Sequence, residues 1–227
     1  QYLDYGILLH ECLENFLKTK EIDISLLKDK LITAWDERGY DTKEYIDQLT
    51  EKAKARGEKP RILQPLEDWL SWAETSMNAI PEFMDTTFPN WVTVSAEHQL
   101  YEPVIADDMK FKGFIDAVIE SDYRKSKRKI WILDWKTAGA FGWNSWKRQD
   151  FLVQAQIALY KKFWRTKENF ECSEVGAGFV LLKRGAKKNP VDFFKVSVGP
   201  KTEEKSEKLL RSMLKTVRTG LFIKNRN

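Results

Sequence analysis

Cysteine residues and long apolar runs are scarce in this chain of 227 residues. The two cysteines, Cys12 and Cys172, cannot form a disulfide framework or a metal site built from cysteine alone. No run of about 18 apolar residues occurs, so the sequence predicts no transmembrane helix and no membrane partner. The first residues also lack a secretion signal, in which a basic stretch precedes an apolar one. We therefore expect an intracellular protein, cytoplasmic or associated with the nucleoid, and encoded by a cell or by a phage.

The formal net charge of +4 conceals an uneven distribution of charged residues. Residues 1–122 carry 13 Lys or Arg against 25 Asp or Glu, a net charge of −12. Residues 123–188 carry 16 against 5, a net of +11, and residues 189–227 carry 9 against 4, a net of +5. One basic run, such as RKSKRK at 124–129, is usually only solvated surface. A whole positive segment favours a polyanionic ligand, and nucleic acid is the first candidate.

The spacing of apolar residues indicates helices in the first part of the chain. Apolar positions recur every three or four residues near the start, which predicts a helix with one apolar stripe: Leu3, Ile7, His10, Leu13 and Leu17. Further helices are predicted at 24–37, 41–56 and 64–79, and Pro81 and Pro89 are expected to interrupt the chain after them.

From residue 91 the apolar residues alternate, which predicts strands. The segments 91–101, 111–121 and 130–138 read as successive antiparallel strands. A helix at 146–166, strands at 175–184 and 191–198, and a helix at about 201–219 follow. This order predicts an α/β fold of the mixed α+β type, with a central mixed sheet flanked by helices. We expect one domain over 1–227, with a helical N-terminal part at 1–88, a sheet core at 91–200 and a C-terminal helix and tail at 201–227.

Several ionisable side chains occupy apolar faces of these predicted elements. Asp134 and Lys136 end the strand IWILDWKTA, and side chains two residues apart point to the same face of a strand. Asp116 lies among apolar neighbours in GFIDAVIE, and Glu97 and His10 occupy comparable positions. Any one of these groups alone would most often pair with another charge in the core. Five such groups together indicate a shared partner, and a divalent cation is one.

The ligand types favour a hard or borderline ion. Carboxylate oxygens suit Mg²⁺ or Mn²⁺, and an added imidazole favours Mn²⁺. We expect Asp116 and Asp134 to bind the ion, with the backbone carbonyl of Trp135 within reach. The histidine and the glutamate would complete or support a second position. Lys136 would orient or deprotonate a water molecule and offset charge on a phosphate oxygen.

The order of these motifs resembles the PD-(D/E)XK nuclease superfamily, specifically its RecB-like exonuclease branch. GFIDAV, ILDWKTA and QAQIALY match a strand with Gly and Asp, a strand ending in hydrophobic–Asp–x–Lys–Thr, and a helix with Gln-x-x-x-Tyr. The family's upstream histidine matches His10, and its acidic residue on the preceding strand matches Glu97. The resemblance covers about residues 10 to 160 and implies a restriction-endonuclease-like core.

The resemblance implies a metal-dependent DNA nuclease. We expect an exonuclease that acts on linear or single-stranded DNA ends in repair, recombination or phage replication. Two alternatives remain open: a non-catalytic nucleic-acid-binding module on the same fold, and a structure-specific, site-specific or RNA-directed endonuclease. Some RecB-like relatives hold an iron–sulfur cluster through one early and three late cysteines. Residues 1–227 lack such late cysteines, so no cluster is expected within them.

Further residues are predicted to contact nucleic acid. The resemblance implies that Gln156 and Tyr160 contact the nucleic-acid backbone or the strand of Lys136. The loop at 138–150 mixes aromatic and basic residues, which can stack on unpaired bases and hold phosphates: Trp143, Trp146, Lys147 and Arg148. Both tryptophans could equally pack on the core. The basic residues Lys183, Arg184, Lys187 and Lys188 predict either a second phosphate contact or a solvated hairpin tip.

Overall fold

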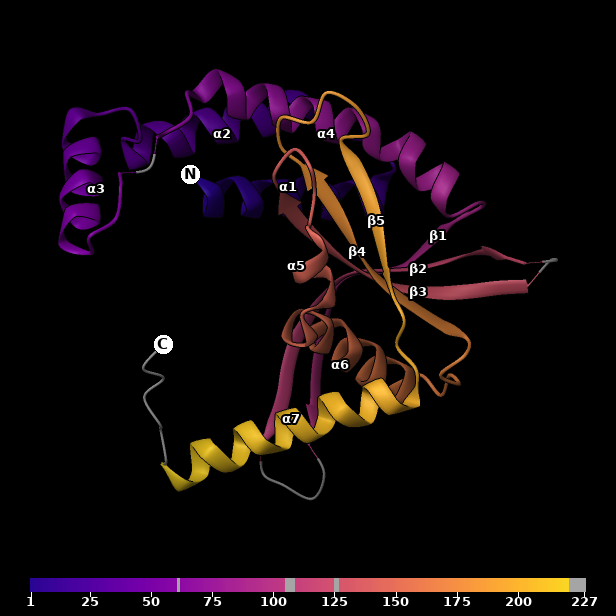
Figure 1. The fold of residues 1–227 in the computed structure, drawn as a ribbon. Helices are drawn as coiled ribbons and strands as arrows, with labels where there is room; N and C mark the ends of the chain where they lie inside the picture. Colours follow the sequence, from indigo (N-terminus) through magenta and orange to yellow (C-terminus); the bar gives the residue numbers. More distant parts are fainter. Residues whose placement is uncertain (61, 105–108, 125–126, 221–227) are drawn as a thin grey trace. The chain divides into compact units, whose positions relative to one another are not determined.

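A computed structural model describes residues 1–60, 62–104, 109–124 and 127–220 (Figure 1). The basic run at 124–129 and the C-terminal tail therefore lie partly outside the described residues. The elements follow one another as α1 (Tyr2–Thr19), α2 (Ile24–Arg38), α3 (Lys43–Ala55), α4 (Leu66–Thr87), β1 (Val92–Pro103), β2 (Lys110–Tyr123), β3 (Lys127–Ala138), α5 (Ser145–Gln149), α6 (Phe151–Lys167), β4 (Val175–Lys183), β5 (Val191–Val196) and α7 (Pro200–Thr219). None of these helices is both long and apolar enough to cross a lipid bilayer.

Within the described residues, the strands form one sheet in the order β1-β2-β3-β4-β5. β1 pairs with β2, and β2 with β3, in antiparallel fashion. The amide of Ile130 donates to Glu174 near the start of β3 and β4, and the amide of Arg184 donates to Ala138 near their ends. β3 and β4 therefore run in the same direction. The mixed sheet with flanking helices confirms the predicted fold class.

The chain divides into two compact units. One comprises Gln1–Thr87, Trp135–Gly142 and Leu181–Asp192, and the other comprises Phe88–Asp134, Trp143–Val180 and Phe193–Asn227. We call them the helical unit and the sheet unit. The boundary passes through β3 between Asp134 and Trp135. The single domain expected over 1–227 stays a prediction.

The helical unit buries only part of the apolar stripe predicted for α1: Leu13 and Leu17 are buried as expected, but the first two members are not. Leu3 and Ile7 are 73% and 49% exposed, whereas Tyr5 and Phe16 are buried. The Tyr5 ring lies 4.9 Å from the ring of Trp69 on α4. The prediction was wrong at Leu3 and Ile7 because α1 carries overlapping apolar stripes, and at this end the core takes the larger rings, which remove more apolar area from water.

Helix α4 also departs from the prediction, since it continues through Pro81 to Thr87. Proline lacks an amide hydrogen, so it cannot donate to the carbonyl of Met77, and an interior proline costs a helix about 3 kcal/mol. Ile80 and Met84, on either side of Pro81, are fully buried. Their burial stabilises the helix enough to offset this cost.

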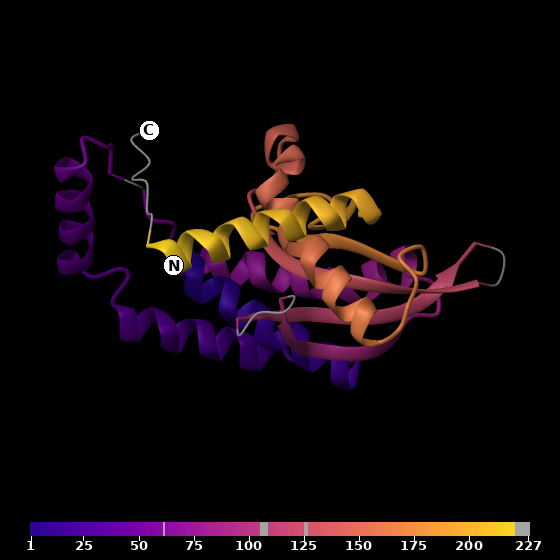
Figure 2. The same ribbon diagram turned by 90° about the horizontal axis from the view of Figure 1, so that it is seen from below.

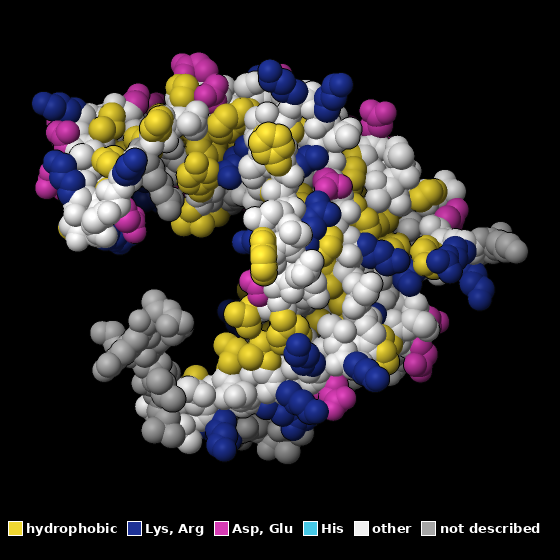
Figure 3. All heavy atoms as spheres, in the orientation of Figure 1, with side chains coloured by type: hydrophobic (Ala, Val, Ile, Leu, Met, Phe, Trp, Pro, Cys, Tyr) yellow, Lys and Arg dark blue, Asp and Glu magenta, His cyan; other side chains and the backbone are white. Residues whose placement is uncertain are grey.

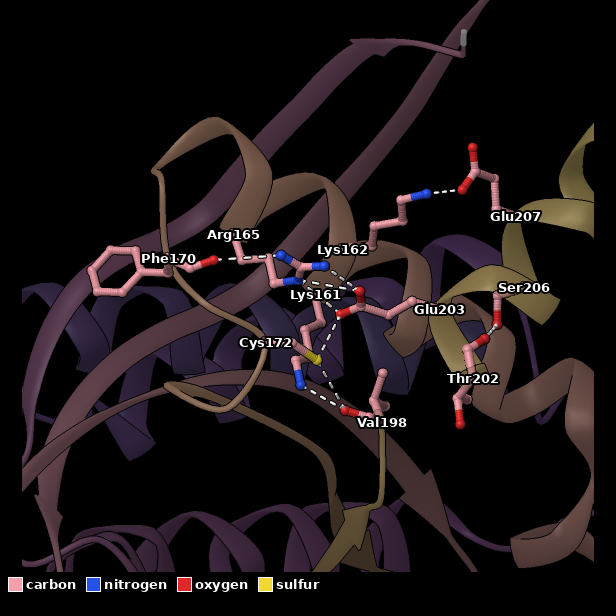
Figure 4. Close-up of polar contacts among 10 residues, drawn as sticks. All are labelled: Lys161, Lys162, Arg165, Phe170, Cys172, Val198, Thr202, Glu203, Ser206 and Glu207. Carbon is pink, nitrogen blue, oxygen red and sulfur yellow. Dashed lines mark hydrogen bonds and ion pairs between the residues drawn. The ribbon is translucent and has the colours of Figure 1, made fainter. Parts of the chain in front are cut away.

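In the sheet unit the predicted helix at 146–166 is two helices. Asp150 has an extended backbone, and its side chain accepts a hydrogen bond from the amide of Leu152, so it ends α5 and caps α6. α7 lies alongside α6 in both ribbon views (Figures 1 and 2). Arg165 on α6 binds the buried Glu203 on α7 through both of its carboxylate oxygens (Figure 4). This contact fixes α7 against α6.

Candidate metal and nucleic-acid site

Glu97 and Asp116 lie opposite each other on neighbouring strands of the sheet unit. β1 and β2 pair Ala96 with Ala117 and His98 with Ile115, which leaves Glu97 facing Asp116 between these pairs. A carboxylate oxygen of Glu97 and one of Asp116 lie within 4.8 Å of each other. Asp116 is only 8% exposed. Two carboxylates at this separation, one of them buried, repel each other unless a cation or proton lies between them.

A β-bulge creates this pairing. The register of β1 and β2 shifts between Thr93 and Ser95. If the pairing of Val92 with Glu120 continued without the shift, Ala96 would face Asp116 and Glu97 would face Ile115. A one-residue slip reverses the face to which every later side chain points. The bulge therefore turns the Glu97 side chain to the face of Asp116 and places it opposite that residue.

Glu97 has an unusual backbone conformation, with φ at 47°. Residues other than Gly, Asn and Asp seldom adopt a positive φ, and this conformation costs of order 1–3 kcal/mol. Such strain persists where the surrounding structure holds it, and it is found frequently at functional sites. The strain at Glu97 is consistent with a side chain held in position for binding.

Asp134 is the third carboxylate of the sheet unit in this region. β2 and β3 pair Ala117 with Leu133, and Asp116 and Asp134 are the next residue on each strand. Asp134 is 2% exposed. We call Glu97, Asp116 and Asp134 the carboxylate cluster. Three neighbouring strands supply its members, all of them predicted from the sequence.

The helical unit holds the other predicted ligands. His10 on α1 lies with Nε2 at 3.1 Å from the backbone carbonyl oxygen of Trp135, the residue that follows Asp134. The indole of Trp135 is 1% exposed, which fixes this carbonyl in place. Lys136 follows and is partly exposed. Two of the predicted ligands, the His10 imidazole and the Trp135 carbonyl, thus face each other.

Tyr160 on α6 fits against Gly113 on β2. A Cβ atom at Gly113 would lie 2.7 Å from Cε1 of Tyr160, so a side chain at this position has no room. The Tyr160 ring also lies 6.1 Å from the ring of Phe111, and its hydroxyl accepts a hydrogen bond from Gln156. Tyr160 is buried and Gln156 is exposed. Gly113 thus lets α6 pack closely on the strand that carries Asp116.

We expect Gly113→Ala to destabilise the protein by about 1–3 kcal/mol, since the buried Tyr160 ring must move to admit the new methyl group. Thermal unfolding measures this loss. Gly139→Ala is the matched control, because a Cβ at Gly139 meets nothing within 4 Å. Equal melting temperatures for the two variants would contradict this packing role.

The two tryptophans of the loop at 138–150 have different surroundings. Trp143 packs on Phe179, with ring centroids 4.9 Å apart, and its carbonyl accepts a hydrogen bond from Arg148. Trp146 on α5 is 84% exposed. Lys147 lies with its ammonium 5.5 Å from the Trp143 ring. The two alternatives for these tryptophans were packing on the core and stacking on unpaired bases. Trp143 packs on the core, whereas Trp146 is exposed to a ligand. The nucleic-acid contacts of this loop stay predictions.

Arg184 is held by aromatic rings of the helical unit. Its guanidinium lies 4.3 Å from the Tyr2 ring centroid and 5.6 Å from that of Trp69. Burial lowers the pKa of this guanidinium. Lys183 is partly exposed, and Lys187 and Lys188 are exposed. These positions leave the lysines more accessible to a phosphate than Arg184.

Positive charge also gathers on the sheet unit away from the carboxylate cluster. Figure 3 shows Lys and Arg side chains over the outer end of β2 and β3. The described residues there include Arg124, Lys127 and Arg128, of which the last pairs with Glu120 and Asp122. This charge lies on the segment for which the sequence predicted a polyanionic ligand.

Comparisons with known proteins give matches that cover most of the chain. A family model described as the PD-(D/E)XK nuclease superfamily matches residues 1–225. Among solved structures, the chain is similar to a proposed exonuclease from Eubacterium rectale, with 13% identity and a TM-score of 0.43 over 89% of this chain and 70% of that one. It is also similar to SSO0001, with 14% identity and a TM-score of 0.38 over 92% and 84%. No curated protein matches the sequence.

Proposed function

Because the chain belongs to the PD-(D/E)XK nuclease superfamily, we propose that it is a Mg²⁺- or Mn²⁺-dependent deoxyribonuclease that acts as an exonuclease on linear or single-stranded DNA ends. Membership of the superfamily implies phosphodiester hydrolysis on nucleic acid with a divalent ion. The choice of DNA, of chain ends, and of a role in repair, recombination or phage replication is the proposed part.

The pairing of Glu97 with Asp116 is the observation that carries this proposal. Two carboxylates within 4.8 Å of each other, with Asp134 one residue beyond the paired end of β3, form an oxygen-rich donor set. Hard divalent cations prefer such donors. Neutralising the charge of the cluster also offsets the cost of burying it. The residues present therefore fit a Mg²⁺ or Mn²⁺ ion.

His10 and the carbonyl of Trp135 support the same assignment. An imidazole nitrogen and a backbone carbonyl oxygen are both groups that would bind a divalent ion. The His10 nitrogen and the Trp135 oxygen are 3.1 Å apart. Imidazole is a more usual ligand of Mn²⁺ than of Mg²⁺. We assign both groups to the ion that the carboxylates bind, since Asp134 and Trp135 are consecutive in β3.

The chain's own residues then have distinct tasks in hydrolysis. When bound, a divalent ion acidifies water and withdraws charge from a phosphate oxygen. Asp116 and Asp134 hold that ion, and Glu97 with His10 completes or supports its coordination. Lys136 donates hydrogen bonds from Nζ to the attacking water or to a phosphate oxygen. The first contact orients the water, and the second offsets negative charge on the phosphate. Gln156, Trp146, Lys147 and Lys183 are assigned to the nucleic-acid backbone or to unpaired bases.

Linear and covalently closed circular DNA of the same sequence test this function. We expect degradation of the linear form in Mg²⁺ or Mn²⁺, no loss of the circular form, and no reaction in EDTA. Gel electrophoresis of end-labelled substrate measures the products. Cleavage of the circle would indicate an endonuclease instead, and binding without cleavage in either metal would indicate a non-catalytic module.

A further inference from the structure

β1 and β2 stay paired beyond Glu97 and Asp116, as far as Pro103 and Lys110, and Figure 1 draws them as a two-stranded ribbon. The strands pair Gln99 with Phe114 and Tyr101 with Lys112. Side chains alternate along each strand, so these residues share the face of Glu97 and Asp116. We call this surface the ribbon face, and all its members are exposed: Gln99, Tyr101, Lys110, Lys112 and Phe114.

The opposite face of the ribbon packs on α6. Gly113 receives the Tyr160 ring, and Phe111 stacks on Phe163 with ring centroids 4.6 Å apart. Lys167 pairs with Glu102 at 3.2 Å. The ribbon is therefore supported from behind, and the ribbon face is not needed for the core of the sheet unit.

The ribbon face interleaves aromatic rings with lysines. Tyr101 and Phe114 are 56% and 44% exposed. The Lys110 ammonium lies 4.6 Å from the Tyr101 ring centroid, and the Lys112 ammonium lies 5.6 Å from that of Phe114. Among the described residues of this face, no acidic side chain occurs beyond Asp116. Single exposed aromatic residues are common, but two rings, each beside an ammonium group, form a surface suited to a ligand with both π-faces and negative charge.

We propose that the ribbon face binds an unpaired segment of the nucleic-acid substrate that leads to or from the carboxylate cluster. Tyr101 and Phe114 stack on unpaired bases, and Lys110 and Lys112 contact phosphates. The bases of a duplex are already stacked on one another, so the two rings discriminate in favour of a single strand. At about 3.3 Å per residue, the face extends about 20 Å from Asp116 to Lys110, enough for several nucleotides. This inference rests on the proposed function, since it takes the cluster as the hydrolytic site.

Equilibrium binding in EDTA tests the inference without hydrolysis. Fluorescence anisotropy of a short labelled single strand and of the corresponding duplex gives both affinities. We expect the double variant Tyr101→Ala with Phe114→Ala to bind the single strand at least about tenfold more weakly, since each stacked base contributes about 1–3 kcal/mol. Its affinity for the duplex should change less than about twofold. Tyr101→Trp with Phe114→Trp should retain single-strand binding, because the aromatic faces remain.

The lysines have a separate test in the salt dependence of binding. Each phosphate contact to a single strand contributes about 0.7 to the slope of log K against log salt concentration. Lys110→Ala with Lys112→Ala should therefore reduce that slope by about 1.4. Lys43→Ala with Lys215→Ala, at two other exposed positions, removes the same net charge and should leave the slope unchanged.

Three results would overturn the inference. They are a wild-type protein that does not bind the single strand, an aromatic double variant that binds it as wild type does, and an equal loss of duplex affinity in that variant. Hydrolysis in Mg²⁺ or Mn²⁺ is measured separately. A wild-type protein that binds the single strand through this face but cleaves no DNA supports the inference and contradicts the proposed function.

Discussion

Replacing Asp134 with asparagine is expected to lower the rate of DNA hydrolysis by roughly 10²- to 10⁴-fold. A divalent ion held by this carboxylate would supply several kcal/mol of charge stabilisation, and each 1.36 kcal/mol corresponds to a factor of ten in rate. Asp134 is 2% exposed, so solvent and mobile side chains cannot replace the lost carboxylate. Asparagine has nearly the same shape, so the packing of β3 should survive. Single-turnover hydrolysis of end-labelled linear DNA measures the loss.

Thermal unfolding separates the loss of a ligand from the loss of the fold. At a concentration of Mn²⁺ about 100 times its dissociation constant, the ion stabilises the wild-type protein by about 2.7 kcal/mol, which raises the melting temperature by about 5–11 °C. Asp134→Asn should lose most of this rise while keeping a cooperative transition in EDTA. Asp122→Asn is the matched control: it changes a partly exposed carboxylate on β2, paired with Arg128, and should keep both activity and the Mn²⁺ response. Full activity of Asp134→Asn would refute the metal-site assignment.

The sequence singled out the carboxylates of the candidate site but could not predict how they align. Asp116, Asp134 and Glu97 could be found because a carboxylate among apolar neighbours is conspicuous in an alternating strand. The pairing of Glu97 with Asp116 depends on the bulge between Thr93 and Ser95, which no residue pattern in this stretch marks. Register is set by contacts between strands, and a bulge changes it without changing the alternation on either side.

Local patterns also failed where tertiary packing chose between equivalent faces. α1 offers more than one apolar stripe, and the rings of Tyr5 and Phe16 occupy the core in place of Leu3 and Ile7. Pro81 was expected to interrupt the chain, but burial of its neighbours keeps it inside α4. The buried face of α1 and the continuation of α4 through Pro81 both depend on the residues packed against these helices. Those residues lie far away in the sequence, so a local pattern does not include them.

The ribbon face shows a signal that sequence reasoning passed over. Gln99 and Tyr101 alternate with Leu100, which is buried, and Lys112 and Phe114 alternate with the buried Gly113. Single exposed aromatic residues are common, and the alternation alone indicates only that each strand has an apolar side. The register and the packing of α6 were needed to show which side faces solvent.

Replacing Arg165 with methionine is expected to destabilise the protein by about 3–5 kcal/mol, the usual cost of leaving one member of a buried ion pair unpaired. Glu203 is 3% exposed, and its carboxylate accepts hydrogen bonds from Nε and Nη2 of Arg165 at 2.9 and 2.5 Å (Figure 4). The thiol of Cys172, 3.4 Å from one oxygen, is too weak a donor to replace a guanidinium. The melting temperature should fall by about 6–20 °C, as measured by circular dichroism.

A second substitution and a surface pair make this prediction specific. Arg165→Met combined with Glu203→Met should recover most of the stability, because it removes the buried charge as well as its partner. Lys208→Ala breaks the pair with Glu204 on the same helix, where the side chains are 74% and 64% exposed, and should cost less than about 0.5 kcal/mol. If Arg165→Met alone melted within about 2 °C of wild type, the Arg165–Glu203 contact would not be what holds α7 on α6. If the double methionine variant melted no higher than Arg165→Met, packing of the guanidinium rather than its charge would be the stabilising contribution.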